Sequence, residues 1–140
     1  MQKKSPRHLA RSLAVQGIYA YKLNQNSILE IENYLAITDA AIYHKANNAL
    51  MHYLLEESIN QFDSLLPLYT PYLHRNLSEV NLIEQIILVI AALELTCNLS
   101  VPAPVIINEA IELAKLYAAP ESYKFINSLV DKLASVTRLK

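Results

Sequence analysis

The chain contains a single glycine, Gly17, among its 140 residues. Two-residue hairpins favour Asn-Gly or Asp-Gly, because their turns need positive φ angles, and neither pair occurs here. A phosphate-binding loop of the P-loop or dinucleotide type is also excluded, because such loops need several glycines. The sequence therefore predicts an all-α protein that lacks these nucleotide-binding motifs.

The amino-acid composition indicates which kind of all-α protein this is. The chain is 53% hydrophobic and 18% charged, with a net charge of −1, which is typical of one ordinary globular domain covering residues 1–140. A protein built to coat nucleic acid is usually more basic, so any nucleic-acid site here must be a local patch. The apolar run at residues 86–93 is too short to cross a bilayer, and no signal peptide is visible.

The single cysteine, Cys97, excludes an intramolecular disulfide and a cysteine-based metal cluster. We expect a cytoplasmic protein on this ground, because a reducing compartment is the default for such a chain.

Capping residues and prolines predict six helices. Ser5 and Pro6 open the first, which runs to about Leu23, and a capping box at residues 27–30 opens the second. Gly17 lies inside the first helix, where it predicts close approach of a neighbouring helix. A break and restart is expected at residues 37–48. The remaining expectations are a long helix from about Ala40 to Leu66 ended by Pro67 and Pro71, a helix capped by Ser78, one from near Pro104 and one after Pro120.

Carboxylates and histidines give little support for catalysis or metal binding. Glu109 and Glu112 are three residues apart on a helix, off its apolar face, which is typical of a solvated surface. His52 and Glu56 form an i,i+4 pair that lacks a third ligand. No nucleophile motif is present. We therefore expect no enzyme activity, no metal and no cofactor.

Basic residues gather at the N-terminus, where they leave two readings open. Arg7 and Arg11 are spaced i,i+4 with His8 beside them, and positive charge there opposes the helix dipole. The cluster fits either a phosphate site or a solvated helix end. Its members are Lys3, Lys4, Arg7, His8 and Arg11.

The motif ESYKF, residues 121–125, also allows two readings. Tyr123 and Phe125 could stack on bases while Lys124 meets a phosphate. Alternatively, Phe125 belongs to the apolar stripe of its helix and is simply core.

Three segments together resemble the NusB family of transcription antitermination factors. They are RHLARSLAVQGIYAYKLNQN at residues 7–26, PYLHRNLSEVNLIEQIILVIAALEL at 71–95 and VPAPVIINEAIELAKLYAAPESYKFINSLVDKLA at 101–134. The resemblance covers nearly the whole chain in register, and its C-terminal signature is long and specific. It implies two small helical bundles packed across each other.

The resemblance also implies a non-catalytic function. Family members bind the boxA element of nascent ribosomal RNA leaders together with NusE, a small-subunit ribosomal protein. The resulting complex helps RNA polymerase pass terminators in rRNA operons. A homodimer that covers the basic face is a further possibility in this family.

Most site residues follow from the resemblance by position, and Lys3 and Lys4 are added from the basic cluster itself. The RNA-binding set is Lys3, Lys4, Arg7, His8, Arg11, Glu121, Lys124 and Phe125, and the partner-binding set is Tyr72, Arg75 and Glu84. His8 and Leu9 stand where arginines are common in the family. We therefore expect weaker boxA binding than in an arginine-rich member, strengthening as His8 becomes protonated below about pH 6.5.

Two other functions remain open at this stage. A NusB-like protein-interaction module with weak or no RNA binding would explain the thinned arginine motif. A NusB-like domain also begins some rRNA cytosine-5 methyltransferases, but this chain has no catalytic region and no Gly-rich cofactor loop.

Overall fold

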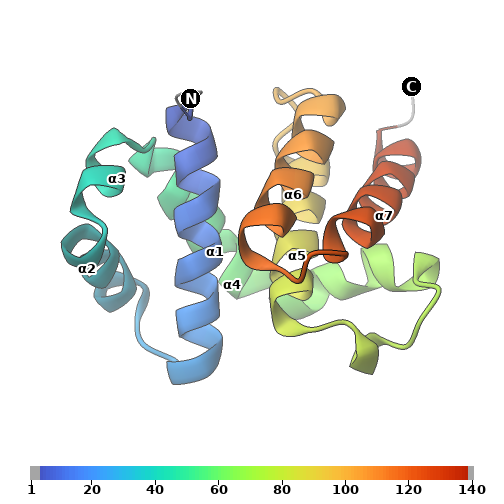
Figure 1. Cartoon of the computed structure of the whole chain (residues 1–140), viewed down its shortest axis with the longest axis horizontal. Helices are drawn as coiled ribbons and strands as arrows, with labels where there is room; N and C mark the ends of the chain where they lie inside the picture. Colours follow the sequence, from blue (N-terminus) through green and yellow to red (C-terminus); the bar gives the residue numbers. More distant parts are fainter. Residues whose placement is uncertain (1–3, 139–140) are drawn as a thin grey trace. The chain divides into compact units, whose positions relative to one another are not determined.

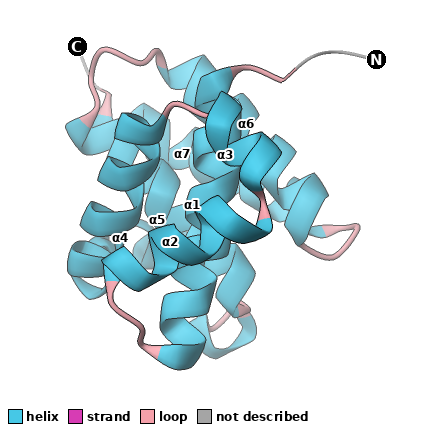
Figure 2. Ribbon diagram, turned by 90° about the vertical axis from the view of Figure 1, so that its left-hand side faces the viewer, coloured by secondary structure: helices cyan, strands magenta, loops and turns pink. Residues whose placement is uncertain are grey.

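The computed structural model describes residues 4–138, and every regular element in that range is helical (Figures 1 and 2). The prediction of an all-α protein is confirmed for this part of the chain. It forms two compact units, Met1–Asn60 and Gln61–Lys140. None of the described helices is both long and apolar enough to span a membrane.

The first unit contains α1 (Pro6–Asn24), α2 (Ile28–Thr38), α3 (Ala40–Lys45) and the first half of α4 (Asn48–Tyr69). Both predicted N-caps are confirmed. The Ser5 hydroxyl accepts the His8 N–H at 3.1 Å. The Ser27 hydroxyl accepts the Glu30 N–H at 3.2 Å, and the Glu30 carboxylate accepts the Ser27 N–H at 3.1 Å. These local bonds fix where α1 and α2 begin.

Gly17 lies where α1 meets α2 and α4. A methyl group placed on it would lie 2.8 Å from Leu55 Cδ1 and 3.1 Å from Ile31 Cγ2. Carbon atoms in contact are normally 3.5–4.0 Å apart, so an alanine would collide with Leu55 and make a tight contact with Ile31. The predicted close approach at Gly17 is confirmed.

The single long helix predicted from Ala40 to Leu66 is wrong, because the segment forms two helices, α3 and α4, and the second ends at Tyr69. The chain breaks after α3, because Asn47 leaves the helix and bonds elsewhere. Its N–H donates to the Pro6 carbonyl at 2.9 Å, and its side-chain oxygen accepts the Leu50 N–H at 3.0 Å. At the other end α4 continues through Pro67 to Tyr69. Pro67 lacks the N–H donor of its position, and α4 ends within one turn of it.

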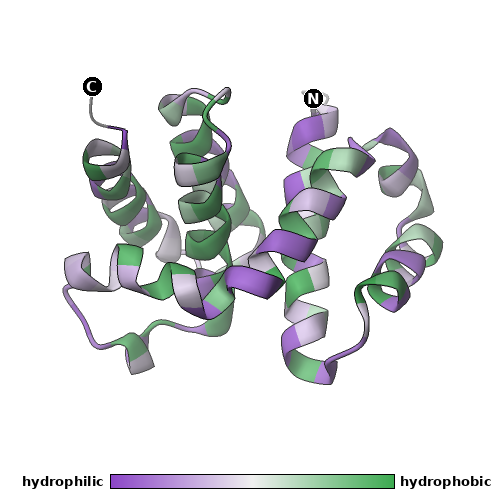
Figure 3. Cartoon of the chain, turned by 180° about the vertical axis from the view of Figure 1, so that it is seen from behind, coloured by the Kyte–Doolittle hydropathy of each residue, from purple (hydrophilic) through white to green (hydrophobic). Residues whose placement is uncertain are grey.

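The second unit contains the end of α4, the short 3-10 helices η1 (Thr70–Tyr72) and η2 (Leu77–Glu79), then α5 (Leu82–Cys97), α6 (Ala103–Tyr117) and α7 (Ser122–Thr137). Residues 86–95 of α5 are all buried, and α6 and α7 pack against α5 and against each other. The hydropathy colours show the same apolar core along these helices (Figure 3). The described chain thus has seven α-helices, one more than predicted, because α3 and α4 are separate.

Ser78 does not cap α5, contrary to the prediction. Asn81 does so, by accepting the Glu84 N–H at 2.9 Å, and Glu84 in return accepts the Asn81 N–H at 3.2 Å. Ser78 lies instead in η2. This reciprocal capping box satisfies two backbone donors, which a lone serine three residues earlier cannot do.

Arg138 closes the C-terminal end of α5. Its guanidinium donates to four backbone carbonyls, those of Leu95 at 2.6 Å, Val101 at 3.1 Å, Glu94 at 3.2 Å and Asn98 at 3.4 Å. The last carbonyls of a helix have no partner within it, so a planar cation can satisfy several of them together. Arg138 therefore connects the end of α7 to the α5–α6 loop.

Candidate RNA and partner interfaces

The start of α1 carries the basic cluster predicted from the sequence. Lys4 and Arg7 are exposed, whereas His8 and Arg11 are only 5% and 2% exposed. Lys3 lies outside the described residues. Arg7 and Arg11 thus do not share one open face, and Arg7 is better placed than Arg11 for a direct phosphate contact.

A pocket of about 640 Å³ lies beside this cluster, between the start of α1 and the end of α3. We call it the α1–α3 pocket. It is lined by Lys4, Ser5, Pro6, Leu9, Ile42 and Lys45. Two of its lining residues are cationic and none is acidic. The hydrogen bond from Asn47 N–H to the Pro6 carbonyl ties the turn after α3 to the first residue of α1, which holds the two walls together.

In the second unit, Arg75 joins residues that the sequence placed in different sites. Its guanidinium carbon lies 3.6 Å from the centre of the Phe125 ring. Its Nη2 donates to Glu84 Oε2 at 3.2 Å, and its Nη1 donates to the Glu79 carbonyl at 3.4 Å. Glu84 is only 3% exposed, so it acts by holding Arg75 rather than by presenting its own charge. The predicted partner residues Arg75 and Glu84 and the predicted RNA residue Phe125 therefore form one cluster.

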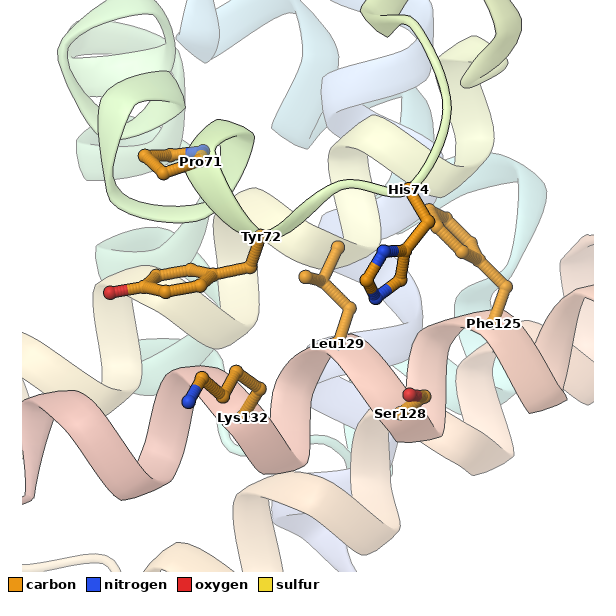
Figure 4. A pocket seen from close by; sticks show the side chains of 7 residues that line it. All are labelled: Pro71, Tyr72, His74, Phe125, Ser128, Leu129 and Lys132. Carbon is orange, nitrogen blue, oxygen red and sulfur yellow. The ribbon is translucent and has the colours of Figure 1, made fainter.

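A groove of about 320 Å³ adjoins this cluster (Figure 4). Tyr72 and His74 extend toward α7 from the segment that precedes α5. Lys132 Nζ lies 5.6 Å from the centre of the Tyr72 ring, within cation–π range. The full lining is Pro71, Tyr72, His74, Phe125, Ser128, Leu129 and Lys132.

Sequence reasoning missed His74, Ser128 and Lys132 in this groove. Helical spacing was a signal for two of them, because positions 125, 128 and 132 lie on one face of α7. His74 carried no such signal, since it follows η1 in an irregular segment.

Glu121 and Lys124 lie at the start of α7 and pair with each other. Lys124 Nζ is 3.2 Å from Glu121 Oε2, and both side chains are largely exposed. Exposed pairs of this kind contribute about 0–1 kcal/mol, so a phosphate can displace the carboxylate at small cost. Tyr123 turns to Lys115 instead, whose Nζ lies 5.0 Å from the ring centre.

His52 lies between two carboxylates of the first unit. Its Nε2 is 2.7 Å from Glu56 Oε2, as the i,i+4 spacing suggested, and its Nδ1 is 3.0 Å from Glu32 Oε2 on α2. The hydrogen bond with Glu32 raises the pKa of His52 above its usual value. His52 thus connects α2 to α4 when it is protonated.

Glu109 and Glu112 are both half-buried on α6, where Ile106, Ala110 and Leu113 make the buried side. Among residues 4–138 no group of three or more His, Cys, Asp or Glu side chains is arranged to hold a metal ion.

The fold and these surfaces together define the class of protein to which the chain belongs. It is an all-helical protein with a basic cluster in one unit and an arginine–aromatic cluster beside a groove in the other. The NusB family model matches residues 8–135. The chain belongs to the NusB family.

Similar proteins cover nearly the whole chain. One from Aromatoleum aromaticum, named transcription antitermination protein NusB, is 40% identical over 139 residues, which is 99% of this chain and 94% of that protein. Proteins of the same name from Alteromonas mediterranea and Pasteurella multocida are 43% identical over 136 residues and 40% identical over 140. These alignments cover 97% and 99% of this chain, and 96% and 95% of the two proteins respectively.

Proposed function

We propose that this protein is a cytoplasmic transcription antitermination factor. In this proposal it binds boxA-type RNA of rRNA operon leaders together with NusE and so joins an RNA polymerase antitermination complex. The observation that carries the proposal is the family match along residues 8–135, with relatives of that name aligned over nearly their full length. The role is one of binding, without catalysis.

The RNA contacts would begin at the basic end of α1. Lys4 and Arg7 are exposed there, and no acidic residue precedes Glu30 in the sequence. This local charge offsets the weak net charge of the whole chain. His8 and Arg11 complete the cluster from buried positions. A second group of RNA contacts would come from Glu121, Lys124 and Phe125, where Lys124 offers a cation and Phe125 a ring face.

NusE would occupy the groove beside Tyr72 and Arg75. The groove combines two aromatic rings, one lysine and apolar side chains, with Arg75 beside it on the Phe125 ring, a mixture that is frequent in protein interfaces. Contacts with Glu84 and Phe125 already fix the orientation of Arg75 in the free protein, so its side chain loses little entropy on binding.

Fluorescence anisotropy of a labelled boxA-type RNA tests this function. The protein is titrated alone and then with its cognate NusE, at two salt concentrations and beside a scrambled RNA. We expect specific binding that NusE tightens, and Arg7→Ala should make the slope of log affinity against log salt shallower by about 0.7. Lys22→Ala, which removes a lysine at the far end of α1, is the matched control. Equal affinity for the boxA-type and scrambled RNAs would overturn the proposal.

A protein-interaction module with little RNA binding is the second candidate. The burial of His8 and Arg11 favours it, because these side chains offer less charge to RNA than their spacing suggested. A homodimer that covers the basic end would act in the same direction. Under this alternative, NusE binds normally while Arg7→Ala with Arg11→Ala leaves RNA affinity unchanged.

A further inference from the structure

The α1–α3 pocket lies outside every contact assigned so far, apart from Lys4. It is the larger of the two hollows described above, at about 640 Å³ against about 320 Å³ for the groove. Its volume is in the range of pockets that hold small organic groups. Pro6, Leu9 and Ile42 form an apolar surface, which Lys4, just before α1, and Lys45, at the end of α3, also line.

We infer that the α1–α3 pocket receives one unstacked base of a single-stranded RNA, with Lys4 and Lys45 on the neighbouring phosphates. This inference rests on the proposed RNA-binding function and adds α3 to the RNA-contacting elements.

The two lysines beside the pocket indicate what kind of ligand it binds. An apolar hollow flanked by lysines suits a ligand that is flat and apolar in one part and anionic in the next. A nucleotide has this composition, since every base has an apolar face and each linkage carries one negative charge. Exposed Arg7 lies one residue beyond Pro6, so the same strand can continue along the basic start of α1.

The geometry also favours a single strand over a duplex. An isolated hollow can accept a base only when that base is turned out of its stack, as in loops and single-stranded segments. The two walls of the hollow are fixed to each other by the chain itself, because Asn47 N–H, just after α3, bonds the Pro6 carbonyl of α1 at 2.9 Å. The base would therefore enter a site that needs little reorganisation.

Two variants separate the base contact from the phosphate contact. Ile42 is 37% exposed, so Ile42→Ser removes apolar contact without opening the core. Lys45→Gln removes one cation from the exposed end of α3. The matched controls lie in the same unit outside the pocket: Ile37→Ser, at a side chain 79% exposed on α2, and Lys22→Gln at the end of α1.

The experiment is an abasic scan of the boxA-type RNA by fluorescence anisotropy in the presence of NusE. We expect one position in the RNA at which removal of the base lowers the affinity of the unsubstituted protein roughly tenfold. Removal of the same base should lower the affinity of the Ile42→Ser variant much less, because that variant has already lost the contact with the base. Lys45→Gln should lower affinity about fivefold at 0.1 M salt and reduce the salt slope by about 0.7. Both controls should bind like the unsubstituted protein.

Two outcomes would overturn the inference. If RNA binds specifically but Ile42→Ser and Lys45→Gln match their controls, the pocket holds no base, while the proposed function stands. If both variants keep RNA affinity and lose affinity for NusE, the pocket serves the protein partner instead. If the unsubstituted protein shows no specific RNA binding, the proposed function itself is wrong.

Discussion

At the scale of single residues, Gly17 shows how one contact outweighs local preference. Alanine is favoured over glycine by about 1 kcal/mol inside a helix. At this position, however, the added methyl would meet Leu55 Cδ1 at 2.8 Å, and Leu55 is itself fully buried. Overpacking of this kind costs about 1–3 kcal/mol. We expect Gly17→Ala to lower the free energy of unfolding by about 1 kcal/mol, measured by urea denaturation.

The control for Gly17 is a double-mutant cycle with Leu55→Ala. If the collision is the cause, Gly17→Ala should become neutral or stabilising once the Leu55 side chain is shortened. Equal destabilisation in both backgrounds would assign the effect to something other than this contact.

His52 predicts a pH dependence within the first unit. Its pKa is raised by the hydrogen bond with Glu32, so the protonated form is favoured in the folded state. The resulting stability is fully present below the unfolded pKa of about 6.5 and is lost as pH rises through the higher folded value. Because the side chain is 49% exposed, the effect should stay below about 1 kcal/mol.

Urea denaturation of His52→Gln, Glu32→Gln and the double variant checks this prediction. We expect a favourable coupling between positions 32 and 52 at pH 5.5 that fades by pH 8.5. A coupling of the same size at both pH values would show that the charge on His52 does not contribute.

At the scale of elements, Arg138 predicts that the far end of α7 stabilises α5. Its guanidinium satisfies four carbonyls around the α5 C-terminus. Hydrogen bonds that involve a charged group contribute about 1.5–3 kcal/mol each at most, and these four share one side chain. We expect Arg138→Ala to lower the free energy of unfolding by about 2 kcal/mol and to speed hydrogen exchange in the last turn of α5.

Arg138→Lys is the control for charge alone. A lysine keeps the positive charge but lacks the planar fork, so it should restore less than half of the lost stability. Full restoration would mean that the charge near the helix end matters and the fork geometry does not.

Helix boundaries were predictable where their causes were local. Ser5 and the Ser27–Glu30 box lie beside the turns they cap, and both were found from sequence. A break was expected within residues 37–48, but its position at Asn47 was not, because its cause is a hydrogen bond to Pro6, far away in the sequence. At α5 two local signals competed, and the reciprocal box of Asn81 overrode Ser78.

The candidate site divides in the same way. Spacing predicted a basic cluster at the start of α1 and an aromatic residue near the start of α7, and their contacts with RNA stay a prediction. The i,i+4 spacing alone places Arg7 and Arg11 on one helix face, but in the structure Arg7 is exposed and Arg11 is buried. The contact of Arg75 with Phe125 joins segments fifty residues apart, and only the packing of the second unit brings them together. Pattern and resemblance therefore supplied the residues, and tertiary structure supplied their grouping.

At the scale of the whole molecule, that grouping predicts that the RNA and partner functions overlap at Phe125. Its ring supports Arg75 at 3.6 Å, and Arg75 adjoins the groove proposed for NusE. Phe125→Leu should therefore weaken NusE binding several-fold even when no RNA is present, because a cation–π contact contributes about 0.5–2 kcal/mol. Isothermal titration calorimetry of the variant with NusE alone measures this effect.

Arg75→Gln provides the decisive background for that measurement. If Phe125 acts on the partner through Arg75, Phe125→Leu should have little further effect on NusE affinity once Arg75 is removed. An unchanged NusE affinity in the single Phe125→Leu variant, together with a loss of RNA affinity, would place Phe125 in the RNA interface alone. The two functions would then meet in the fold without sharing a residue.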